Sequence, residues 1–133
     1  MRAGVPIITM VVSGVLMSGC AAQSGDPAVD RASHFYAAIA AKDAAAACAD
    51  LASEARKALE QQEGKPCEDA ILDQDLPEAV EHGKAHVYGS MVQVAYANET
   101  AFLSRYGDGW LLTAVGCPPV SGDKPHDCAI EVG

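Results

Sequence analysis

Apolar residues in the first half of the chain recur every three or four positions, which is the spacing of one helix face. Asp26-Pro27 is a helix-start signal, because aspartate caps free backbone N–H groups and proline suits the first helical position. We therefore expect a helix over residues 27–41. Its buried face would carry Val29, Ala32, Tyr36, Ile39 and Ala40.

Shorter helices are predicted after the first one. Asp43 and Ser53 can cap two of them, because short polar side chains accept hydrogen bonds from the first free N–H groups of a helix. Gly64 should end the helix that begins near Ser53, since glycine adopts the left-handed conformation of a helix C-terminus without strain. Pro66 opens another short helix, and Pro77 ends it.

From Ala85 onward the pattern changes to an alternation of apolar and polar residues, which is typical of strands. The alternation predicts strands at residues 85–96, 100–106, 110–117 and 128–132. We interpret Gly89 as a β-bulge, Ala97-Asn98-Glu99 as a turn, and Gly107-Asp108-Gly109 as a hairpin turn. One face of the third strand is expected to carry Trp110, Leu112 and Ala114.

Helices followed by strands indicate an α+β domain at residues 27–133, with N-terminal helices packed on a curved antiparallel sheet. Residues 35–48, from Phe35-Tyr36 to Cys48, resemble the opening helix pair of NTF2-like (cystatin-like cone) domains. Residues 108–112, Asp-Gly-Trp-Leu-Leu, resemble a strand start common in that superfamily. The resemblance implies a cone with a pocket between helices and sheet. It implies no activity, because this fold hosts enzymes and binding modules alike.

The candidate pocket residues are aromatic. Tyr36, Tyr88 and Trp110 would line the pocket, and Tyr36 would offer a hydroxyl from the inner face of the first helix. The alternative is that these three side chains fill the core, with their polar tips hydrogen-bonded. No carboxylate falls inside an apolar stripe of the pattern, which argues against an enzyme that uses acid–base catalysis.

The N-terminal residues have the pattern of an export signal. Arg2 is followed by a mostly apolar run, Val5–Met17, which is too short and too interrupted for a membrane-spanning helix. The run ends in Leu16-Met17-Ser18-Gly19-Cys20, which resembles the lipobox of bacterial lipoproteins. This resemblance implies removal of residues 1–19, acylation of Cys20 and a short tether over residues 20–26. The alternative is an uncleaved or ordinarily cleaved signal in which the cysteine is incidental.

The chain has five cysteines, and lipidation of Cys20 would leave an even set. Four cysteines in an oxidising compartment indicate two disulfides. Three pairings are possible, and we favour Cys48–Cys67 and Cys117–Cys128 because each pair lies within one structural half. The cysteine pattern, with its Gly116-Cys117 step, is similar to that of small exported actinobacterial lipoproteins.

The 133 residues carry a formal net charge of −9. The excess of acidic residues argues against nucleic acid as a partner and against electrostatic docking on anionic lipid. Membrane attachment would therefore depend on acyl chains. The sequence contains no CxxC, GxSxG, P-loop or GxGxxG motif. His82 and His86 would lie about 13 Å apart in an extended chain. We therefore expect no metal site and no cofactor.

These features favour a lipid-anchored protein on the extracytoplasmic face of the cell membrane. Its domain would be a non-catalytic module that binds an envelope protein or a small apolar ligand. The alternative is a small cone-fold enzyme, similar to isomerases or cyclases, that acts on a hydrophobic substrate at the membrane surface. A purely structural spacer is a third interpretation.

Overall fold

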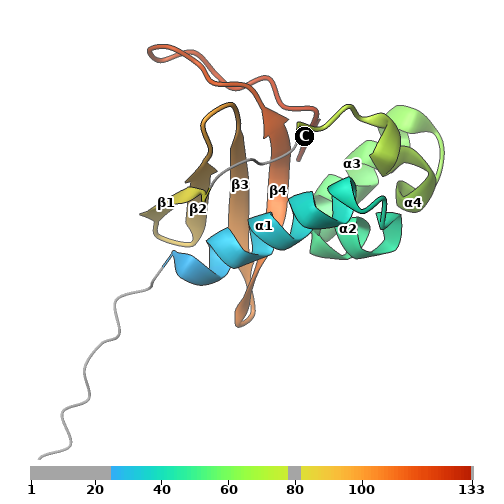
Figure 1. Ribbon diagram of the computed structural model, residues 1–133, viewed down its shortest axis with the longest axis horizontal. Coiled ribbons are helices and arrows are strands. Elements are labelled where there is room, and N and C mark those ends of the chain that lie inside the picture. Colours follow the sequence, from blue (N-terminus) through green and yellow to red (C-terminus); the bar gives the residue numbers. More distant parts are fainter. Residues whose placement is uncertain (1–24, 78–81, 133) are drawn as a thin grey trace, which may run out of the picture.

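The computed structural model describes residues 25–77 and 82–132. It shows helices followed by a five-stranded antiparallel sheet, which confirms the α+β class (Figure 1). The expected leader at residues 1–19, the lipidation site Cys20 and most of the tether lie outside the described residues. Among the residues that are described, no helix is long and apolar enough to cross a membrane.

The helices lie close to their predicted bounds. They are α1 (Asp26–Ala40), α2 (Ala44–Asp50), α3 (Ser53–Glu63) and α4 (Cys67–Ala70), and a short 3-10 turn follows at Ile71–Asp73. Two predicted caps are wrong, because α1 is capped by Gly25 rather than Asp26, and α3 by Ala52 rather than Ser53. Each polar residue lies one position further on, in the first turn of its helix.

Two other helix boundaries follow the prediction. The Oδ1 atom of Asp43 accepts a hydrogen bond from the backbone N–H of Ala46 at 3.1 Å, which makes Asp43 the cap of α2. Gly64 ends α3 with a φ of +66°, a left-handed conformation that glycine adopts without a side-chain clash. Local sequence signals therefore determine where these helices begin and end.

The strands form a meander in chain order. They are β1 (Lys84–Tyr88), β2 (Met91–Ala95), β3 (Thr100–Tyr106), β4 (Gly109–Cys117) and β5 (Ile130–Glu131). The first predicted strand is two strands, because Tyr88 lies opposite Met91 and the two residues between them form a hairpin turn. Gly89 is therefore a turn residue and the bulge interpretation is wrong; its φ of +62° suits a tight hairpin.

An irregularity in the pairing of β3 with β4 changes which side chains of β4 face the core. Leu103 lies opposite Leu112, whereas Phe102 lies opposite Ala114, so β4 accommodates one extra residue at this point, and a second shift in register follows between Phe102 and Thr100. Ala114 leaves the face on which the alternation placed it, and Val115 joins the core instead. The bulge thus gives the two faces of the sheet a composition that strict alternation does not predict.

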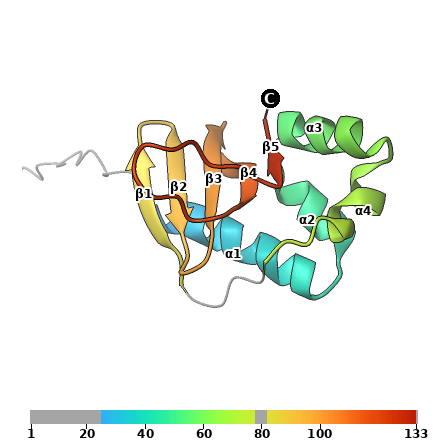
Figure 2. The same ribbon diagram turned by 90° about the horizontal axis from the view of Figure 1, so that it is seen from above.

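Helix α1 packs along one face of the sheet, and α2, α3 and α4 gather beyond β4 (Figures 1 and 2). We call the face against α1 the inner face and the opposite one the outer face. Alanines on α1, such as the buried Ala28 and Ala32, let the helix approach the strands closely. The core between them includes Phe35, Tyr36, Val92, Val94, Leu103, Leu112 and Val115.

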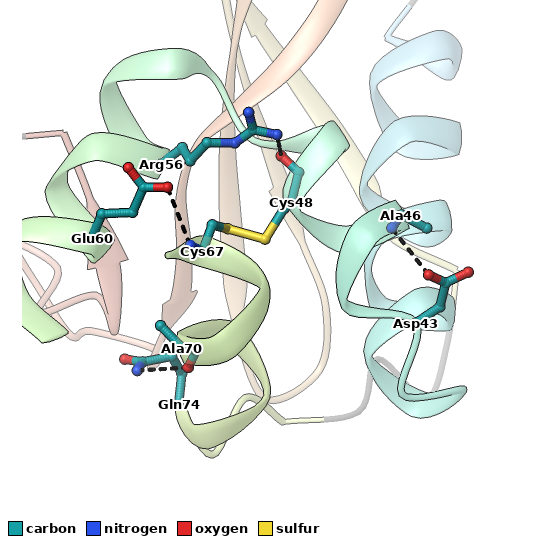
Figure 3. The surroundings of a disulfide bond; sticks show 8 residues. All are labelled: Asp43, Ala46, Cys48, Arg56, Glu60, Cys67, Ala70 and Gln74. Atoms are coloured by element: carbon teal, nitrogen blue, oxygen red, sulfur yellow. Dashed lines mark hydrogen bonds between the residues drawn. A yellow bond between two sulfur atoms is a disulfide. The ribbon is translucent and has the colours of Figure 1, made fainter. Parts of the chain in front are cut away.

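Two disulfides join the pairs of cysteines that we favoured. Cys48–Cys67 connects α2 to α4, with a Cα–Cα distance of 6.1 Å, and lies in the core (Figure 3). Hydrogen bonds from α3 support it: Arg56 Nη2 donates to the Cys48 carbonyl at 3.1 Å, and Glu60 Oε1 accepts from the Cys67 N–H at 3.1 Å. The second disulfide, Cys117–Cys128, links the end of β4 to the segment before β5.

Candidate functional site

A groove of about 480 Å³ lies on the outer face of the sheet, away from α1. Its floor consists of side chains that alternate along β3, together with neighbours on β4. Its walls come from β2, from residues 126–128 and from the C-terminal strand. We call this site the outer groove; it is lined by Met91, Phe102, Ser104, Tyr106, Thr113, Ala114, His126, Cys128, Glu131 and Val132.

The segment of residues 118–129, which we call the arm, builds one wall of the groove. The arm leaves the end of β4 and returns over the strands to β5 (Figure 2). The disulfide Cys117–Cys128 closes it, and the Ala129 N–H donates to the Gly116 carbonyl at 3.1 Å. Within the arm, His126 Nδ1 lies 3.2 Å from the carbonyl oxygen of Pro118. These links hold the arm in a defined position over the sheet.

His126 meets the floor of the groove through an aromatic contact. Its ring lies 5.2 Å from the ring of Phe102, edge to face. The two residues are far apart in the sequence, and the arm brings them together. The contact orients an imidazole and a phenyl ring along the same apolar surface.

Apolar side chains around the outer groove remain exposed to solvent. Met91, Tyr106 and Val132 are each exposed by more than a third, and Tyr88, which lies opposite Met91, is 64% exposed. Large apolar side chains gathered around a concave site are typical of ligand-binding or protein-binding surfaces. This part of the outer face therefore has the composition of a binding site.

Carboxylates lie beside the apolar floor. Glu131 lines the groove, and Glu54 on α3 accepts a hydrogen bond from the Tyr106 hydroxyl at 3.3 Å. Desolvation and the neighbouring Glu54 charge raise the pKa of Tyr106, so its hydroxyl remains protonated. Hydrogen bonds from its own backbone N–H, from Ser53 and from Tyr106 lower the pKa of Glu54, whose carboxylate is therefore ionised at neutral pH.

The predicted pocket residues lie elsewhere. Tyr36 and Trp110 are buried, Tyr36 in ring contact with Phe35 and Tyr96, and Trp110 beneath the guanidinium of Arg105. Tyr88 is exposed on β1. None of the three lines the outer groove. Two smaller hollows lie beside α1, one against Pro27 and His34 and the other between α1 and residues 82–85, and none of the three lines these either.

Glu99 is the carboxylate that the sequence pattern missed. We expected it in an exposed turn, but it is only 1% exposed, and neither carboxylate oxygen has a hydrogen-bond partner. It precedes β3 in phase with the buried Ala101 and Leu103, so its side chain belongs to the inner face. Desolvation raises the pKa of Glu99 to about 8. This alternation was the signal available in the sequence.

A second buried carboxylate, Asp50, has partners on α1. Its Oδ1 pairs with Arg31 Nη1 at 2.7 Å, and its Oδ2 contacts His34 Nδ1. The side chain of Asp50 is 1% exposed, whereas those of Arg31 and His34 reach solvent. The ion pair fixes the end of α2 against α1, and we interpret it as structural.

The histidine pair that we considered for a metal does not form a recognisable centre. His82 precedes β1 and His86 lies within that strand. Over residues 25–77 and 82–132, no group of three or more histidine, cysteine, aspartate or glutamate side chains is arranged to hold a metal ion.

Comparison with protein-family models, with curated proteins and with solved structures finds no match for this chain. The groove supplies an apolar concave surface, and its polar groups come from Ser104, Tyr106, Thr113, His126 and Glu131.

Proposed function

We propose that this protein is a lipid-anchored, extracytoplasmic binding module that holds a small apolar ligand in the outer groove. The observation that carries this proposal is the groove itself, a concavity of about 480 Å³ with an aromatic and aliphatic lining. Pockets of 300–1,000 Å³ with such linings are typical of small-molecule sites. A concave site favours a small ligand over a flat protein partner.

The extracytoplasmic location is proposed from two independent features. The Leu16–Cys20 segment resembles the lipobox, and the four cysteines that remain after Cys20 form two disulfides. Disulfides persist in oxidising compartments outside the cytosol, and acyl chains on Cys20 would hold the domain at the membrane surface. Both features support a location outside the cytosol.

The arrangement also supports membership of the NTF2-like (cystatin-like cone) superfamily. A long first helix lies along one face of an antiparallel sheet, and Trp110 follows Gly109 at the start of β4. A ligand in the outer groove would then bind on the face opposite the interior of the cone.

A catalytic role in a small cone-fold enzyme is the second candidate function. The observation that favours it is Glu99, because a carboxylate with a pKa of about 8 inside an apolar site is a suitable general acid or base. Catalysis also requires that substrate reach the carboxylate. Glu99 is 1% exposed and lines neither the outer groove nor the two hollows beside α1. The binding module is therefore the better-supported function.

Ligand binding in the groove can be tested with a neutral fluorescent probe, N-phenyl-1-naphthylamine. We expect the Phe102→Ala variant to bind this probe about tenfold more weakly, because it loses most of an aromatic contact surface. The matched control is Leu72→Ala, which truncates an exposed apolar side chain outside the groove. Equal probe affinity in wild type and Phe102→Ala would reject the outer groove as the binding site.

Lipid anchoring can be tested by metabolic labelling with a palmitate analogue in the native host. We expect label on the wild-type protein and recovery of that protein in the membrane fraction, because the acyl chains are its anchor. The Cys20→Ala variant should carry no label and should leave the membrane. Label that persists in Cys20→Ala, or an unlabelled wild type, would contradict the anchor.

A further inference from the structure

We infer that the outer groove selects a cationic amphiphile, an apolar chain or ring system that carries an ammonium group, over neutral and anionic ligands. This inference rests on the proposed function, because it concerns the ligand class of the same site. It follows from the charges and aromatic faces around the groove.

The charge of the residues that line the groove is negative. Glu131 contributes a carboxylate, and no lysine or arginine is among the lining residues. Over the described residues, Glu131 is exposed and has no ion pair. The headgroup of a fatty acid or an anionic phospholipid would therefore meet a negative charge without a cation to balance it.

A second carboxylate lies at the rim. Glu54 contacts the hydroxyl of Tyr106, whose ring lines the groove, and this places the carboxylate next to the aromatic surface. Lys57 on the same helix attracts Glu54 and offsets part of its charge. Glu131 is thus the principal anionic group available to a ligand, and Glu54 adds to the negative potential at one end.

The floor of the groove suits an ammonium group as well as an apolar chain. Phe102 and Tyr106 lie on the same face of β3, with Ser104 between them. Aromatic faces attract a cation held within about 6 Å of the ring centre. An ammonium group beside Glu131 and these rings gains from both interactions, whereas a carboxylate or sulfate gains from neither.

The surroundings of the groove strengthen the same preference. The arm carries Asp123 and Asp127 against a single lysine, Lys124, and the whole chain has a net charge of −9. A negative field raises the local concentration of cations and lowers that of anions. The effect decreases with added salt, because exposed charges are screened.

The test uses three probes with the same eight-carbon chain and different headgroups: octyltrimethylammonium, 1-octanol and octanoate. The affinity of each is measured from its displacement of N-phenyl-1-naphthylamine from the domain at pH 7.5 and low salt. We expect octyltrimethylammonium to bind about tenfold more tightly than octanoate, with octanol between them. The Glu131→Gln variant should reduce the advantage of octyltrimethylammonium about threefold and leave octanol unchanged. The control Glu68→Gln, which neutralises an exposed carboxylate on α4, should change none of the affinities.

The outcomes separate this inference from the proposed function. Equal affinities for the three octyl compounds, or the tightest binding by octanoate, would overturn the cationic preference. If displacement of the fluorescent probe still depends on Phe102, the outer groove remains the binding site in that case. An unchanged preference in Glu131→Gln would also overturn it. If the wild-type domain binds neither the fluorescent probe nor any octyl compound, the proposed function fails as well.

Discussion

Replacing Glu99 by glutamine is expected to stabilise the domain above neutral pH and to flatten the pH dependence of its unfolding. Glu99 is buried without a hydrogen-bond partner, and desolvation raises its pKa from 4.5 to about 8. Between these two values the folded protein keeps a proton that the unfolded chain releases. The Glu99 contribution to stability is therefore fully present below pH 4.5 and is lost as the pH rises toward 8.

The expected effect is large. A pKa difference of one unit between folded and unfolded states corresponds to about 1.4 kcal/mol, so the wild type should lose several kcal/mol of unfolding free energy between pH 5 and pH 9 relative to Glu99→Gln. Urea unfolding at the two pH values measures this difference. The matched control is Glu68→Gln, because its carboxylate is exposed. A wild-type stability that follows that of Glu99→Gln over the whole range would show that the Glu99 carboxylate is hydrated or paired.

Removing the Cys48–Cys67 disulfide is expected to lower the free energy of unfolding by about 3 kcal/mol on the chain-entropy model. The two cysteines are 19 residues apart, and the bridge ties the four-residue helix α4 to α2 (Figure 3). A helix this short is not stable by itself, so it depends on the disulfide and on the hydrogen bond between Glu60 and Cys67.

The measurement is urea unfolding of the wild type and of a variant with both Cys48→Ala and Cys67→Ala. Alanine at both positions avoids leaving a free thiol or a buried hydroxyl. Hydrogen exchange of the amides of residues 67–73 should accelerate more than that of β3, because α4 loses its covalent link first. A change in unfolding free energy below about 0.5 kcal/mol would mean that packing around α4 holds it without the bridge.

Local signals predicted the helices and most of the turns. The cap at Asp43 and the C-terminal glycine at Gly64 need only neighbouring residues, so the chain specifies them without tertiary context. Gly89 was harder to interpret, because a glycine inside an alternating pattern fits a bulge as well as a two-residue turn. In the structure Gly89 is a turn residue, and Val87 lies opposite Val92 across the hairpin.

The bulge between β3 and β4 could not be read from the sequence. It depends on pairing with a neighbouring strand, and its effect is that Ala114 lies in the outer groove while Val115 lies in the core. Glu99 illustrates a different difficulty. Its alternation with Ala101 and Leu103 was visible, but the turn preference of Asn98 favoured an exposed position.

The candidate site was less predictable than the fold. Tyr36 and Trp110, which the sequence suggested for the pocket, are core residues. The prediction failed because an apolar periodicity cannot distinguish a packed core from the wall of a cavity. The outer groove depends on the arm, whose position over the sheet follows from the Cys117–Cys128 disulfide and the contact between His126 and Phe102. The disulfide was favoured from the sequence, whereas the contact between His126 and Phe102 is a long-range feature that neighbouring residues do not specify.

The most direct test of the proposed binding surface is amide chemical-shift mapping while N-phenyl-1-naphthylamine is added to the ¹⁵N-labelled domain. We expect the perturbed amides to concentrate at residues 102–106, 113–114 and 126–132, which surround the outer groove. Perturbations that concentrate instead around Tyr36, Tyr96 and Glu99 would place the ligand between helix and sheet, and would contradict a binding site on the outer face.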